Sequence, residues 1–132
     1  GVIVAKTPPL VFLTSNNVRD LGDALKRRCL HLHIPLPDAA LERRIVASRV
    51  PDIEATLTAE LVGFVQSLRT LDLRKSPSIS ETVDWARALI LLNADSLDVE
   101  VVRDTLNVLL KFEPDINAVE PQIGELLRRP AA

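Results

Sequence analysis

The pattern of apolar and polar residues changes its period near Asp38. Before this point, residues 10–14 form a short apolar run that ends in a polar cluster, which predicts a buried strand followed by a loop. Residues 29–34 alternate strictly between polar and apolar side chains, which predicts a second strand with one apolar face. Between these strands, the segment 20–27 has the character of a short helix.

After Asp38 the apolar residues recur at helical spacing. The helices expected from this spacing run over about 38–50, 58–71, 78–93, 98–112 and 121–129. Four of them begin at residues that are typical N-caps: Asp38, Thr58, Ser78 and Asp98. Ser78 is followed three residues later by Glu81, the signature of a capping box. Pro121 suits the first position of the last helix.

The inward faces of these helices follow from the same spacing. Residues expected in the core are Leu41, Ile45, Val46, Leu61, Phe64, Val65, Leu68, Val83, Trp85, Ala86, Ile90, Val102, Leu106 and Leu109. The chain is therefore predicted to be mainly α-helical, with the end of an α/β sheet domain over 1–37 and an antiparallel helical bundle over 38–132. Because the two strands lack parallel neighbours, we expect the first 35 or so residues to be disordered or to pair between copies.

Composition adds few constraints. The 132 residues are 47 % hydrophobic but only 3 % aromatic, so aliphatic side chains must fill the core. A formal net charge of −2 provides no general attraction to nucleic acid or anionic membranes, and no apolar run approaches the ~20 residues that span a bilayer. Cys29 is the single cysteine, which excludes an intrachain disulfide and fits a reducing cytoplasm. The absence of any methionine suggests a piece excised from a longer protein.

Two polar sites in the first part of the chain could carry chemistry. Asn16 follows the first predicted strand, where α/β sheets bind ligands, although such a residue also suits a turn. Arg27 and Arg28 precede the second strand, where they could equally be a solvated basic helix end. His31 and His33 share a strand face but lack further metal ligands nearby, so we expect no metal site, and we expect Cys29 to be a packing residue.

The segment from Pro8 to Asp38, PPLVFLTSNNVRDLGDALKRRCLHLHIPLPD, resembles the second half of an AAA+ ATPase core of the MoxR type. Residues 73–89, LRKSPSISETVDWARAL, resemble the helical lid of a subgroup of these proteins. The resemblance implies that Asn16 is the sensor-1 residue, which orients the water that attacks the γ-phosphate. It also implies that Arg28, with Arg27 in reserve, is the arginine finger that reaches a neighbouring subunit.

The chain departs from the family at the sensor-2 position. Many relatives place an arginine after Ser-Pro at the start of the third lid helix, where this chain has Ser78. The N-terminus of that helix suits an anion, and Arg74 or Lys75 could supply positive charge just upstream. Arg74 and Lys75 also fit a solvated loop pair, and Arg87, two turns into the helix, is less well placed.

The sequence lacks both a phosphate-binding loop (Walker A) and an apolar strand ending in Asp-Glu (Walker B). The resemblance therefore implies the C-terminal portion of an ATPase, inactive alone, whose parent binds ATP and Mg²⁺ and remodels or activates a partner protein. It further implies a homo-oligomeric ring, often of six subunits, and a partner with a von Willebrand factor A domain. Two alternatives stay open: a non-enzymatic helical interaction module, and a clamp-loader-like AAA+ subunit, which the Arg-Arg-Cys triplet also suits.

Overall fold

The computed structural model describes residues 1, 3–4, 6–15 and 21–128. The chain divides into two compact units, Gly1–Ile34 and Pro35–Ala132. In the first unit the described residues contain one short helix, α1 (Asp23–Lys26), with no buried residue. No helix in the described part of the chain is long and apolar enough to cross a membrane.

The two predicted strands are wrong for the described part of the first unit. Residues 10–14 and 29–34 adopt no strand, and their apolar side chains are exposed to solvent, from Phe12 at 82 % to Leu30 at 104 %. A strand is held by hydrogen bonds to a neighbouring strand, and no neighbouring strand is present among the described residues. The alternating pattern therefore describes a segment suited to a sheet, although no sheet forms among the described residues.

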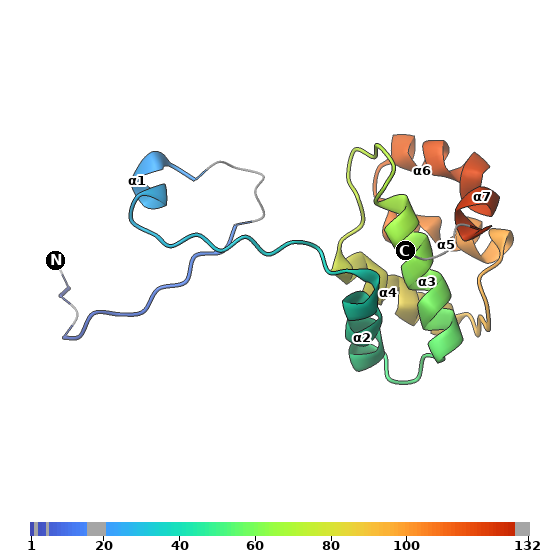
Figure 1. Cartoon of the computed structure of the whole chain (residues 1–132), viewed down its shortest axis with the longest axis horizontal. Helices are drawn as coiled ribbons and strands as arrows, with labels where there is room; N and C mark the ends of the chain where they lie inside the picture. The colour runs from blue at the N-terminus through green and yellow to red at the C-terminus, as the bar shows by residue number, and fades with distance from the viewer. Residues whose placement is uncertain (2, 5, 16–20, 129–132) are drawn as a thin grey trace. The chain divides into compact units, whose positions relative to one another are not determined.

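The described residues of the second unit form a bundle of six α-helices (Figure 1). The helices are α2 (Ala39–Arg49), α3 (Ala55–Leu68), α4 (Ile79–Leu91), α5 (Val99–Leu109), α6 (Glu113–Val119) and α7 (Ile123–Arg128), with a 3₁₀ turn η1 (Glu120–Gln122) before α7. Helix α3 contacts α2, α4 and α7, so it lies at the centre of the bundle. The mainly helical character of the chain is thus confirmed.

Side chains at the predicted caps fix the starts of three helices. Asp38 Oδ1 accepts a 2.8 Å hydrogen bond from the Leu41 amide at the start of α2, and Asp98 Oδ1 accepts one of the same length from Val101 at the start of α5. Ser78 caps α4 as part of a capping box. These contacts satisfy amides that the first turn of a helix leaves without an intrahelical partner.

The predicted start of α3 is wrong by about one turn. Its N-cap is Glu54, and Thr58 lies inside the helix, where its buried hydroxyl donates to the Glu54 carbonyl at 2.9 Å. The apolar face begins at Leu57, which is buried and precedes Thr58. Burial of Leu57 therefore extends the helix past a residue that locally suits a cap.

The end of α4 is a Schellman motif. Asn93 has a positive φ of 53°, the Asn93 amide donates to Ile90 O at 2.9 Å, and the Ala94 amide donates to Leu89 O at 3.0 Å. This left-handed residue closes the helix and satisfies two of its last carbonyls. Asparagine tolerates that conformation better than most residues with a side chain.

The last part of the bundle contains a helix that the sequence pattern does not predict, α6. Helix α6 occupies the segment before Pro121, and Pro121 lies in η1 rather than at the start of α7. Pro114 and Pro121 each stand in the first residues of their elements, where the missing amide proton costs no intrahelical hydrogen bond. The two prolines therefore divide this segment into short consecutive helical pieces.

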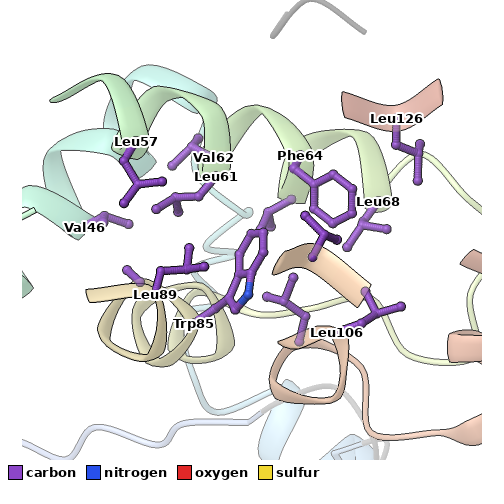
Figure 2. Packing of buried hydrophobic residues seen from close by; sticks show 14 of the residues in the cluster. Val46, Leu57, Leu61, Val62, Phe64, Leu68, Trp85, Leu89, Leu106 and Leu126 are labelled. Carbon is purple, nitrogen blue, oxygen red and sulfur yellow. The ribbon is translucent and has the colours of Figure 1, made fainter. Parts of the chain in front are cut away.

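The core forms around Trp85 and Phe64, whose ring centroids lie 5.6 Å apart (Figure 2). The Trp85 side chain is fully buried, and its Nε1 donates a 2.8 Å hydrogen bond to Thr105 Oγ1 on α5. The predicted inward residues are buried or partly buried with one exception, Leu41, which is 45 % exposed. On α2 the prediction is confirmed for Val46, which is buried, and the other buried residues are Ala39 and Glu42.

Candidate functional site

The predicted arginine finger lies in the first unit. Arg27 is the C-cap residue of α1, and the Arg28 amide donates to Leu25 O at 3.0 Å, so the short helix fixes the backbone of both residues. Both side chains are exposed. Asn16, the predicted sensor-1 residue, lies outside the described residues. The residues predicted around the start of α4 belong to the second unit.

The structure brings Arg74, Lys75 and Ser78 together in the loop that leads into α4. The buried carboxylate of Asp115 on α6 accepts hydrogen bonds from the Arg74 and Lys75 amides at 2.8 and 3.1 Å. The Arg74 guanidinium lies 4.7 Å from the centre of the Phe112 ring, a cation–π contact. Asp115 therefore holds the backbone of the loop while both basic side chains stay exposed.

The first turn of α4 is already neutralised by its own acid. Glu81 Oε2 accepts a 2.9 Å hydrogen bond from the Ser78 amide and another from the Ser78 hydroxyl, and Lys75 Nζ lies 3.6 Å from Glu81 Oε1. Burial acts to raise the pKa of Glu81, but the hydrogen bonds from Ser78 and the charge of Lys75 outweigh it, so the pKa lies below its ordinary value. A carboxylate thus stands where the predicted anion would approach the Ser78 amide.

The most strongly organised polar site in the described part of the chain was not predicted. We call it the Glu42 cluster, and it consists of Glu42, Gln66, Arg69 and Thr82. Glu42 on α2 is fully buried, and Arg69 binds it in a bidentate manner, with distances of 2.6 Å to Oε2 and 2.8 Å to Oε1. Gln66 Nε2 donates to Oε2 at 2.7 Å, and Thr82 Oγ1 donates to Oε1 at 2.8 Å.

The Glu42 cluster also holds backbone from two other segments. Arg69 Nε donates to Pro77 O at 2.9 Å, and Gln66 Nε2 donates to Pro37 O at 3.3 Å. Among the described residues, no buried side-chain nitrogen or oxygen lacks a hydrogen-bond partner. A buried charge with every partner in place is stable where it sits, so this arrangement indicates a positioning role rather than a reactive acid.

A cavity of about 330 Å³ opens between α3, α7 and the segment before α5. It is lined by Ala59, Glu60, Gly63, Phe64, Leu97, Leu126 and Leu127. Glu60 Oε2 accepts a 2.8 Å hydrogen bond from the Leu97 amide at this place. The described lining contains one carboxylate and no basic side chain, so it is unsuited to a phosphate.

The remaining candidates carry no site in the described residues. Arg87 is exposed and lies 3.4 Å from Asp84, one turn away on the same helix. His31 and His33 are exposed, and the described part of the chain contains no group of three His, Cys, Asp or Glu side chains that could hold a metal ion. Cys29 was expected to pack, but its thiol is exposed because the strand that would have buried it does not form here.

No protein-family model, curated protein or solved structure matches this chain. Its function must therefore be argued from its own residues and their placement.

Proposed function

We propose that this chain is the C-terminal portion of an AAA+ ATPase of the MoxR type, in which residues 38–132 form the helical lid. Its full-length parent would couple ATP hydrolysis to the remodelling or activation of a partner protein, working as a ring of identical subunits with a von Willebrand factor A domain protein as a possible partner. The proposal includes a cytoplasmic location, which the single cysteine, Cys29, fits.

The observation that supports this proposal most is the order of features along the chain. An exposed arginine pair at Arg27 and Arg28 precedes the apolar alternation of residues 29–34, which leads into a separately packed helical bundle. The apolar side chains of that segment are exposed, although the bundle after it has a complete core. A segment of this kind suits the edge of a sheet that other residues supply.

The nucleotide-facing residues of the lid fit a phosphate only in part. Arg74 and Lys75 are exposed cations on a loop held by Asp115, which suits an anionic ligand. The Ser78 amide, in contrast, is bound by Glu81. We therefore assign the charge contact to Arg74 and Lys75, and assign to Ser78 the fixing of the start of α4.

In the parent, MgATP supplies the phosphoryl group whose transfer to water drives the conformational work. In that parent, Asn16 orients the attacking water, as the resemblance implies. Arg28, with Arg27 in reserve, extends from the subunit edge and neutralises negative charge at the neighbouring subunit's site.

The first test is the reading frame that encodes these residues. The proposal expects a Gly-Lys-Ser/Thr phosphate-binding loop and an Asp-Glu strand within about 150 residues upstream, the size of an ordinary domain. Their absence would leave the helical interaction module, which the self-contained core of the bundle also supports. A frame whose upstream half instead carries clamp-loader features would favour the clamp-loader-like alternative.

The second test is ATP turnover by the complete protein. Arg28→Ala is expected to lower kcat by roughly a thousandfold, because a finger stabilises charge only in the transition state. Arg44→Ala changes an exposed arginine on α2 and is expected to leave turnover unchanged. Turnover that is unaffected by both Arg28→Ala and Arg27→Ala would remove the finger assignment.

A further inference from the structure

The Glu42 cluster connects two proline segments that lie far apart in the sequence. Gln66 on α3 and Arg69, the C-cap residue of α3, share the Glu42 carboxylate. Gln66 also holds the carbonyl of Pro37, which precedes the cap of α2. Arg69 also holds the carbonyl of Pro77, which precedes Ser78, the cap of α4.

The physical reason for cooperation among these contacts is burial. Glu42 is fully buried, and Arg69 is only 9 % exposed, so water cannot replace a hydrogen bond that is lost. Withdrawing one donor from a buried carboxylate leaves a polar group unsatisfied, which is far more costly than losing an exposed contact. The donors around Glu42 are therefore expected to shift together rather than one at a time.

We propose that the Glu42 cluster is a coupling device, which transmits a displacement of the chain at Pro37 to the N-terminus of α4. Pro37 lies two residues after the start of the second unit at Pro35, and the N-terminus of α4 follows the exposed loop that carries Arg74 and Lys75. A ligand or partner that moves either place thereby changes the other. This inference rests on contacts within the bundle, and it stands whether or not the bundle is an ATPase lid.

Reciprocity gives the test, because a coupling free energy acts equally in both directions. The experiment measures amide hydrogen exchange at single residues in the complete chain. Gln66→Leu removes the hydrogen bonds to Pro37 O and to Glu42 Oε2. It is expected to accelerate exchange at the far end, at the amides of Ser78 and Thr82, by about tenfold, because one of the donors that hold Glu42 to this end is lost. Thr82→Val perturbs the α4 end, and it is expected to accelerate exchange of the Leu41 and Glu42 amides by a similar factor.

The controls separate coupling from general loosening. Gln122→Leu removes a partly buried glutamine whose exposed hydrogen bond to Ala118 O is 2.8 Å long, and it is expected to leave exchange at both ends unchanged. The exchange rates of the Val102 and Leu106 amides on α5 report global opening of the bundle, and these rates are expected to stay constant. Gln66→Asn retains an amide on a shorter side chain and serves if Gln66→Leu does not fold. Acceleration confined to the end that was mutated, in both variants, overturns the proposal.

Discussion

At the scale of single residues, the main finding is a buried acid, Glu42, which the spacing of apolar residues predicts to lie on the outer face of its helix. The pattern of α2 predicts an inward Leu41, yet Glu42 is the fully buried residue and Leu41 is 45 % exposed. The partner that makes this possible, Arg69, lies 27 residues away. Periodicity treats a glutamate as outward, so only a three-dimensional contact reveals the pair. The core positions of Trp85 and Phe64, in contrast, follow directly from their spacing.

The ion pair at Glu42 makes a direct prediction about stability. Arg69→Met leaves a buried carboxylate without its bidentate partner, and it is expected to lower the free energy of unfolding by about 3–5 kcal/mol. The Arg69→Met/Glu42→Met double variant removes the stranded charge and is expected to recover most of that loss. Chemical denaturation followed by circular dichroism measures both.

The matched control is the exposed pair Arg103–Glu120, which is 3.5 Å apart with side chains 49 % and 44 % exposed. Arg103→Met is expected to cost less than about 1 kcal/mol, because water screens an exposed pair. If Arg69→Met and Arg103→Met lowered the free energy of unfolding equally, burial would not determine the contribution of the Glu42 pair to stability.

At the scale of helices and loops, starts and stops were predicted where a local signal decides them. The caps at Asp38, Ser78 and Asp98 each combine a short polar side chain with an apolar stripe that begins directly after it. The local pattern predicts neither the start of α3 nor helix α6. Burial of Leu57 extends α3 toward its N-terminus, and two prolines, at 114 and 121, each begin a new short helical element. The loop contact of Asp115 also joins distant segments and leaves no local pattern.

The capping box of α4 predicts a pH dependence with a definite sign. Hydrogen bonds and Lys75 hold the pKa of Glu81 below its ordinary value despite burial, so its ionised form is stabilised by folding. Its contribution is therefore fully present above the unfolded value of about 4.3 and is lost as the pH falls through the lower folded value. The stability difference between the unsubstituted chain and Glu81→Gln is expected to stay constant above about pH 5 and to shrink as the pH falls through about 4.3 and below.

Thermal unfolding across that pH range measures the difference. Glu100→Gln provides the comparison, because Glu100 also lies in the first turn of a helix but its carboxylate is exposed. A difference for Glu81→Gln that is constant with pH, or that grows as the pH falls, would contradict the assigned role of the carboxylate.

At the scale of the whole molecule, the residues of the core all come from the second unit. The buried apolar cluster extends from Ala39 to Leu126, while the first unit contributes none of its members among the described residues. The change of period near Asp38 indicated a different kind of structure on its two sides, but the strands before it could not be judged from their own residues. Whether an alternating segment becomes a strand depends on a neighbour outside that segment.

The division predicts that residues 35–132 fold alone. We expect this shorter chain to unfold cooperatively at a midpoint within about 2 °C of the complete chain, because it retains the entire buried cluster. The complete chain is expected to associate more readily, through exposed apolar residues such as Phe12 and Leu30. Circular dichroism melting and light scattering at matched concentrations measure the two effects, and loss of the cooperative transition would contradict the division.

The position of Trp85 has a practical consequence for experiments of this kind. It is the only tryptophan, and the chain has no tyrosine. Its indole is fully enclosed by the bundle and bonded to Thr105. Ultraviolet fluorescence from this 132-residue chain therefore originates at one place, between α3, α4 and α5, and follows the opening of the bundle without any added dye. Residues 1–34 contain neither tryptophan nor tyrosine. A change in tryptophan emission therefore reports a change around the core of the bundle and not an event confined to residues 1–34.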